Sequence, residues 1–323
     1  MNTHTPDLEA RPVAADLSCI AREFAAIPHL SLRRHDGNEL REEIQLPLTG
    51  RQQAGFGGAQ WLCTTRVRAV AGRLGTFDLE VTFAVTAGHA AEVGTAVGIT
   101  CGEWSPDNHV LLPGAVYRGN DFAVSAMPYP PMWTDPAMFR ADMPTTITDL
   151  PRLSGDSLRI EQTTGDVSTP GMGFQAPARR QGILMLTGQA TRFGNSGLTV
   201  ETTADRSGCM FLVTAPCVRE FRQGHCSAVP GSDRAAGWHS GDEVTIRLRL
   251  CFFDAPRLQD LFDQLAAMRK DLNPAVRCEE LPFSAAWEML EAKYHRDNWV
   301  ESPGYFKMAP NANTTSEFAE DPL

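Results

Sequence analysis

The sequence lacks long apolar runs. No segment approaches the roughly 18 to 20 apolar residues that a membrane-spanning helix needs, so we expect no membrane partner. The N-terminus also lacks a basic segment followed by an apolar core, which indicates that there is no secretory signal. The cytoplasm is therefore the predicted compartment.

Positive charge is scarce as well. The 29 Lys and Arg residues are outnumbered by 39 Asp and Glu residues, which gives a formal net charge of −10, and no basic cluster stands out. Binding to a phosphate backbone requires a basic surface, so nucleic acid is excluded as a predicted partner.

Metal-ligand patterns are missing too. The eight cysteines include no C-x-x-C pair, which favours reduced and mostly buried thiols. His225 and Cys226 are adjacent rather than spaced, and His239 stands alone. The glycines at 171 and 173 precede no predicted helix, so a phosphate-binding loop is not indicated. We predict no metal and no cofactor.

Period-two alternation dominates the chain from residue 31 to residue 254. Leu79, Val81, Phe83 and Val85 alternate with polar residues, and so do the apolar residues between 246 and 252. Strands do not alternate with helical segments, which argues against a parallel sheet. The sequence predicts a mainly β protein with a large antiparallel β-sandwich (supersandwich).

Helical spacing appears outside this region. Residues 1–30 form an N-terminal segment with a short helix expected over 14–26 that ends at Pro28. Residues 255–300 are predicted as a helical linker, with one helix from about 255 to 272 capped by Asp254 and a second from Ser284 to about 295. These helices pack back on the sandwich or lead into a helical domain. Residues 301–323 are expected to be irregular or disordered.

A stretch rich in aromatic and amide side chains lies between residues 104 and 133. Pyranose rings stack on aromatic side chains and exchange hydrogen bonds with Asn, Asp and Arg, so this mixture is typical of a glycan site. The alternative is that the aromatics belong to the core and the polar residues only form turns. The candidate substrate-binding residues are Trp104, Asn108, Tyr117, Asn120, Asp121 and Trp133.

Catalytic carboxylates are not identified. A glycosidase needs two acids that face each other, but every candidate aspartate lies in a turn-like context. The residues considered are Asp107, Asp121, Asp156, Asp166 and Asp205. Residues 194–197 could suggest a serine elbow, but the strand-like run that follows indicates a hairpin turn. We therefore assign no catalytic residue.

Several segments resemble a family of known enzymes. They are WSPDNHVLLPGAVYRGN (104–120), GDVSTPGMGF (165–174), GNSGLTVE (194–201), DRSGCMFLVTAPCVRE (205–220) and LPFSAAWEMLEAKYHRDNWVE (281–301). Together with the order of strands and helices, they resemble the N-terminal β-supersandwich and helical linker of bacterial glycoside hydrolase-like proteins of the six-hairpin, or (α/α)6-toroid, superfamily. The resemblance covers roughly residues 40–305. Arg118 and Asp121 depart from the Asn and Arg that are more usual around the Gly-Asn pair.

This resemblance implies a function without catalysis in the chain itself. In such enzymes the catalytic carboxylates lie on toroid helices, which would begin about where this chain ends. The implied role is the non-catalytic β-sandwich portion of a carbohydrate-active enzyme, truncated before the toroid. Its expected partners are a carbohydrate and a helical toroid domain in trans, or an oligomer partner, through residues 255–300. An exposed apolar stripe on residues 258–272 and 287–294 would follow.

Two other functions remain open. A stand-alone carbohydrate-binding module would use the aromatic loop around Trp104 and Tyr117. A small complete sugar lyase or epimerase would work in the sandwich cleft, and it would need a charged cluster at one end of the sheets.

Overall fold

A computed structural model describes most of the β region and part of the C-terminal segment. The described residues are 13–105, 107–116, 126–128, 144–146, 159–203, 205, 207–223, 228–272, 282–302, 304–307 and 320–321. The chain divides into two compact units, Met1–Met268 and Arg269–Leu323, and each is described by itself. Among the described residues, the helices are too short or too polar to span a membrane.

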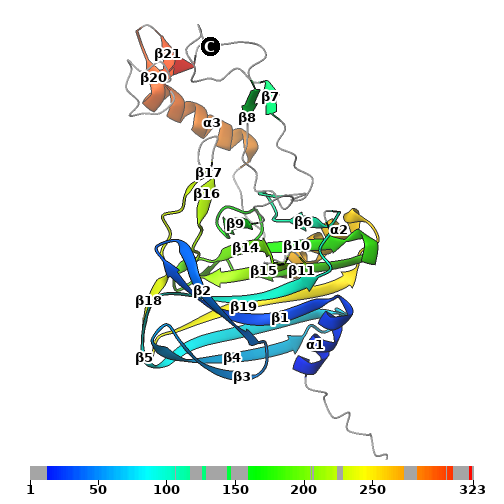
Figure 1. Cartoon of the computed structure of the whole chain (residues 1–323). Helices are drawn as coiled ribbons and strands as arrows, with labels where there is room; N and C mark the ends of the chain where they lie inside the picture. The colour runs from blue at the N-terminus through cyan, green and yellow to red at the C-terminus, as the bar shows by residue number, and fades with distance from the viewer. Residues whose placement is uncertain are drawn as a thin grey trace, which may run out of the picture. The chain divides into compact units, whose positions relative to one another are not determined.

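One long strand, β5 (Thr76–Gly102), belongs to both sheets of the sandwich (Figure 1). Its second half lies in sheet A, whose strand order is β2-β1-β5-β15-β14-β9, with β18 pairing near the middle of β5. Its first half lies in sheet B, in the order β3-β4-β5-β19-β11-β10-β6. Every strand pairing in the described residues is antiparallel, which confirms the predicted fold class.

The strand bounds follow the sequence alternation closely. In sheet A the strands are β1 (Ala26–Asp36), β2 (Glu39–Pro47), β9 (Arg159–Thr163), β14 (Gly197–Thr202), β15 (Gly208–Ala215) and β18 (Ala236–His239). In sheet B they are β3 (Arg51–Phe56), β4 (Ala59–Ala69), β6 (His109–Leu111), β10 (Gly171–Ala176), β11 (Gln181–Thr187) and β19 (Glu243–Asp254). Short hairpins are β7 (Ala126–Pro128) with β8 (Pro144–Thr146), β12 (Ala190–Thr191) with β13 (Gly194–Asn195), and β16 (Phe221–Gln223) with β17 (Ala228–Pro230). A 3-10 turn, η2, covers Pro177–Arg179.

The core lies between the two sheets. The odd-numbered residues of β5 from Phe77 to Val85 face it, and Trp61 meets Trp238 edge-on with ring centroids 4.9 Å apart. The opposite face of β5 and β19 is polar: Arg249 pairs with Asp78 at 2.7 Å, and Arg247 pairs with Glu80 at 3.0 Å. The strand with one solvated face is therefore present as predicted.

The N-terminal helix is α1 (Val13–Glu23), and it packs on the core through Leu17 and Ala21. Its end differs from the prediction. The helix stops because Ala25 adopts a positive φ of 48° and β1 begins at Ala26. Pro28 lies inside β1 instead of ending the helix.

The second helix, α2 (Leu258–Leu272), begins three residues later than predicted because Asp254 does not cap it. Asp254 is the last residue of β19 and pairs with Gln181. The side chain of Met268 is fully buried against Leu184 and Leu186 of β11. The expectation of an exposed apolar stripe is wrong for Leu261 and Met268, which are buried, whereas Leu272 at the end of the stripe is exposed.

The second unit contains α3 (Phe283–Lys293), a π-helical turn η3 (Tyr294–Asn298), and the short strands β20 (Trp299–Val300), β21 (Tyr305–Lys307) and β22 (Glu320–Asp321). The helix starts after Pro282 without a side-chain cap, so Ser284 is not its cap. Trp299 packs on Phe306 with ring centroids 4.9 Å apart. This helix exposes Phe283, Trp287, Met289 and Leu290, and Tyr294 of η3 is exposed as well.

Candidate functional site

The expected aromatic loop is described only in part. Trp104 is half-buried and stacks on Phe174 with the ring centroids 6.3 Å apart. Its backbone N–H donates to the Ser207 carbonyl at 3.0 Å. Asn108 is buried. Tyr117, Asn120, Asp121 and Trp133 lie outside the described residues. The contacts of Trp104 fit a residue at the edge of the core.

The candidate aspartates do not form a facing pair in the described part of the chain. Asp107 is exposed. Asp205 accepts hydrogen bonds from Thr203 and Ser207 within its own turn, and these bonds lower its pKa to about 2. Asp166 pairs with Arg219 at 3.1 Å, whereas Asp121 and Asp156 lie outside the described residues.

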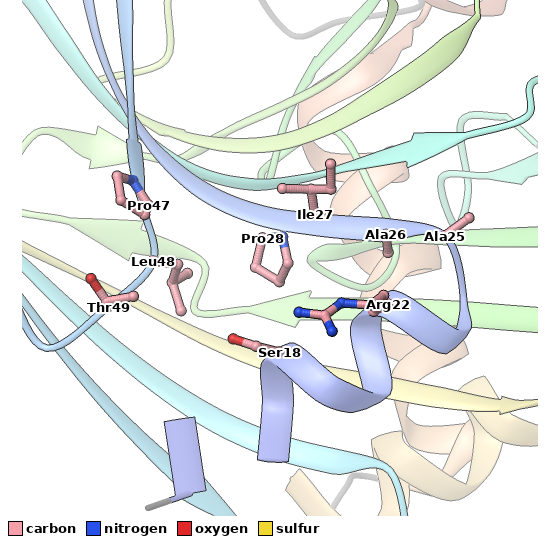
Figure 2. A pocket seen from close by; sticks show the side chains of 9 residues that line it. All are labelled: Ser18, Arg22, Ala25, Ala26, Ile27, Pro28, Pro47, Leu48 and Thr49. Carbon is pink, nitrogen blue, oxygen red and sulfur yellow. The ribbon is translucent and has the colours of Figure 1, made fainter. Parts of the chain in front are cut away.

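A surface hollow of about 510 Å³ lies beside α1 (Figure 2). Ile27, Pro28, Pro47 and Leu48 contribute apolar surface, and Arg22 is the single charged residue among the nine that line it. One cation beside apolar side chains cannot carry acid–base chemistry. The chemically active groups of the described chain gather elsewhere.

The face of sheet A that points away from the core is polar and buried. On β1, Leu30 and Leu32 face the core, whereas the alternate residues do not. The alternate residues form a buried polar ladder of His29, Ser31, Arg33 and His35. Opposite this ladder, β5 places Gly98, Ala96 and Gly94. Small residues on the central strand therefore leave room for the long side chains of β1.

Side chains meet across this face from strands that are not neighbours. Arg33 of β1 contacts Glu201 of β14 at 3.1 Å, and Gln45 of β2 donates to the Met210 Sδ of β15 at 3.5 Å. Two strands lie between the members of each pair. Strands are about 4.8 Å apart, so these contacts require a curled sheet whose polar face is concave.

Arginine and glutamate side chains occupy this concave face. Arg33 lies 3.1 Å from Glu201 and 3.8 Å from Glu43. Arg159 of β9 lies 2.7 Å from Glu161, 3.4 Å from Glu201 and 3.0 Å from Glu220. Glu201 therefore links the two arginines.

A third arginine, in the segment that follows β15, extends the network. Arg219 holds Asp233 through its Nε and Nη2 atoms at 2.7 and 3.2 Å, and it holds Asp166 at 3.1 Å. The next residue, Glu220, donates its backbone N–H to Glu161 at 2.8 Å. We call the following residues the charged cluster: Arg33, Glu43, Arg159, Glu161, Asp166, Glu201, Arg219, Glu220 and Asp233.

Burial shifts the titration of several groups here. Burial raises the pKa of Glu161 against the opposing effect of Arg159. Burial, assisted by Arg33 and Arg159, lowers the pKa of His35 to about 4, and burial also lowers the pKa of His29. At neutral pH both imidazoles are therefore uncharged, while Glu161 is easier to protonate than an ordinary glutamate.

All four ladder residues carry a buried polar atom that has no hydrogen-bond partner within the described chain, and two of them are neutral groups suited to a sugar hydroxyl. Ser31 Oγ and His29 Nε2 are both buried, and neither has a hydrogen-bond partner among the described residues. Buried polar atoms normally find a partner, so these two indicate a place where a polar partner would be stabilised.

Sequence reasoning missed this face, although the signal was present. Residues 29–35 alternate His, Leu, Ser, Leu, Arg, Arg, His, which places a basic and hydroxyl-bearing row opposite a leucine row. The glutamates come from strands distant in sequence, so their convergence depends on the sheet order. Among the described residues, no group of three His, Cys, Asp or Glu side chains has the geometry to hold a metal ion.

Three solved structures show a remote likeness to this chain. No family model and no curated protein matches the sequence. A candidate aldose 1-epimerase from Escherichia coli K12 aligns with a TM-score of 0.32 at 7% identity, over 63% of this chain and 68% of that one. The Slr1438 protein of Synechocystis sp. PCC 6803 aligns with a TM-score of 0.28 at 11% identity, over 62% and 65%.

A third structure is similar to the same degree. A candidate aldose 1-epimerase from Klebsiella pneumoniae aligns with a TM-score of 0.29 at 11% identity, over 68% of this chain and 54% of that one. None of the three is described as a six-hairpin glycosidase. Likeness at this level says nothing about the chemistry of this chain.

Proposed function

We propose that the chain is the β-sandwich part of a carbohydrate-active protein and that it contacts sugar through the concave face of sheet A. The observation that carries this proposal is the charged cluster on a buried face that the core does not need. Burying ions costs free energy that well-packed apolar residues would not cost. Clusters of buried groups with shifted pKa values gather at functional sites.

The composition of this face suits a sugar. Hydroxyl groups donate and accept hydrogen bonds, and fixed carboxylates, guanidinium groups and hydroxyls give a pocket its specificity. Carboxylates of Asp166 and Glu220 reach solvent at the end of the face, with 51% and 36% of each side chain exposed. A glycan would therefore approach from this end. The motifs that resemble carbohydrate-active enzymes support the same class of ligand.

The same proposal gives α3 the role of contacting a helical partner. Phe283, Trp287, Leu290 and Tyr294 follow helical spacing and are between 46% and 93% exposed. Exposed apolar patches of this kind normally mark interfaces. A monodisperse monomer that binds no hydrophobic dye would contradict this part of the proposal.

Glycan binding by paired variants tests the proposal. We expect calorimetry to detect sugar binding by the whole chain and Arg159→Gln to abolish it. Arg247→Gln is the matched control, because Arg247 makes a similar cross-strand ion pair on the solvated face of sheet B. Near-UV circular dichroism checks that both variants fold. Absence of binding to every glycan, or equal effects of the two substitutions, would refute the proposal.

A second function, a sugar epimerase, is favoured by one specific observation. Glu161 and His35 lie near Arg159 on the same face, with pKa values moved in opposite directions. Opening a pyranose ring requires a base that removes the anomeric hydroxyl proton and an acid that protonates the ring oxygen as its bond to C1 breaks. Neutral His35 would act as the base, and Glu161, whose pKa burial raises, would act as the acid.

Polarimetry of a freshly dissolved α-anomer tests this second function. Equilibration faster than the buffer rate, lost in Glu161→Gln, would support epimerase activity. A wild-type rate equal to that of buffer alone would exclude it and would leave only the binding role.

A further inference from the structure

Carboxylates outnumber guanidinium groups in the charged cluster by six to three. The two histidines of the ladder do not offset this excess, because burial keeps them uncharged at neutral pH. Counted over the described residues, the charged cluster is therefore negative overall. An excess of carboxylates affects which charge a bound sugar can carry. This step rests on the proposed sugar-binding function.

Each arginine of the cluster is already shared between carboxylates. Arg33 has two carboxylates within 4 Å, Arg159 has three, and Arg219 has two. Recognition of a sugar acid relies on a guanidinium that can turn its paired N–H groups toward the ligand. An incoming carboxylate would have to displace one of these acids and would add a further negative charge.

The buried ladder supplies an independent indication of a polar ligand. Ser31 Oγ and His29 Nε2 point from β1 into the same concave face and lack partners among the described residues. A hydroxyl and a neutral imidazole bond well to uncharged hydroxyl groups. The face thus combines groups that can hydrogen-bond to sugar hydroxyls with carboxylates that would attract a cation.

We propose that the concave face accepts a sugar that bears a free amino group, binds neutral sugars more weakly and rejects sugar acids. An ammonium group brings three N–H donors and one positive charge to a site with excess carboxylates. A carboxylate in the same position meets like charges, and such contacts strongly disfavour the wrong partner.

Glu161 gives this proposal a second readout. The charged and titratable groups that act on it are Arg159 on its own strand, Arg33 from β1, Glu201 from β14, and Cys217 and Glu220 after β15. Burial favours its protonated form, and a bound ammonium would favour the ionised form instead. Binding of an amino sugar should therefore lower the pKa of Glu161 and release any proton that it holds, whereas a neutral sugar should leave this pKa unchanged.

Calorimetry with three monosaccharides tests the proposal on the whole chain. The ligands are glucosamine, N-acetylglucosamine and glucuronate, at a mildly acidic pH that keeps the amine charged. We expect glucosamine to bind about tenfold more tightly than glucuronate, with the difference shrinking at high salt. Repeating the titration in buffers of different ionisation enthalpy measures the protons released.

Two variants test whether the charge of the face, and not its shape, sets the preference among the sugars. Glu201→Gln should reduce the preference for glucosamine, whereas Glu80→Gln on the solvated face of sheet B should leave it unchanged. Equal or tighter binding of glucuronate would overturn the charge inference while the proposed sugar-binding function stands. No binding of any of the three sugars would overturn the charge inference, and the proposed function would fall with it only if no other glycan binds.

Discussion

Arg33 and Glu201 form an ion pair of 3.1 Å although their strands are separated by β5 and β15. Three strand spacings on a flat sheet amount to about 14 Å, which the two side chains reach across only because sheet A curls. The small residues of β5 beneath this contact are as necessary to it as the charges. The polar site and the curvature of the sheet therefore depend on each other.

Gly98→Ala should destabilise the curled sheet. A Cβ at this position would lie 2.4 Å from both the Leu212 Cδ2 and the Phe211 carbonyl oxygen, so neighbouring strands must move apart. Overpacking of this kind costs about 1 to 3 kcal/mol of unfolding free energy. Urea unfolding measures it, with Gly237→Ala as a control, because a Cβ at Gly237 meets no atom within 4 Å. Equal stability of the two variants would contradict the close approach of β5 and β15.

His35 should make stability depend on pH. Burial lowers its pKa to about 4 in the folded chain, against 6.5 for an ordinary histidine, so between these values mainly the unfolded state binds a proton. The contribution of His35 is fully present above pH 6.5 and is lost as pH falls toward 4, by on the order of 2 kcal/mol.

Unfolding curves at several pH values check this expectation. The difference between wild type and His35→Gln should change across that pH range. A constant difference between the wild-type and His35→Gln curves would show that His35 is not buried in its neutral form.

Met268→Ala should test whether α2 belongs to the sandwich. Met268 is fully buried against β11, and removing a buried side chain of this size costs about 2 to 5 kcal/mol. Leu272→Ala, four residues later on the same helix, removes a side chain that is 43% exposed and should cost much less. Thermal unfolding measures both, and similar small losses would mean that the helix does not cover sheet B.

Local patterns predicted the fold well, and the site poorly. The alternation of apolar and polar residues in β5 and β19 predicts these strands because it shows which residues face the core. The apolar stripe of α2 predicts that helix in the same way. Nothing local, however, shows that Asp254 continues a strand, since that depends on pairing with Gln181. Likewise, Glu161 and Glu201 meet Arg33 only through the strand order and curl of sheet A.

Trp104→Ala should distinguish the two roles considered for this residue. Its stacking on Phe174 and its half-buried position predict a loss of about 2 to 3 kcal/mol in unfolding free energy. If it only supports the core, the fraction of variant that stays folded should bind sugar with wild-type affinity, because the charged cluster is intact. Calorimetry at a temperature where the variant is folded makes this comparison, with Phe174→Leu as a control that disturbs the same stack. If Trp104→Ala lost affinity for the sugar and Phe174→Leu did not, Trp104 would contact the glycan directly.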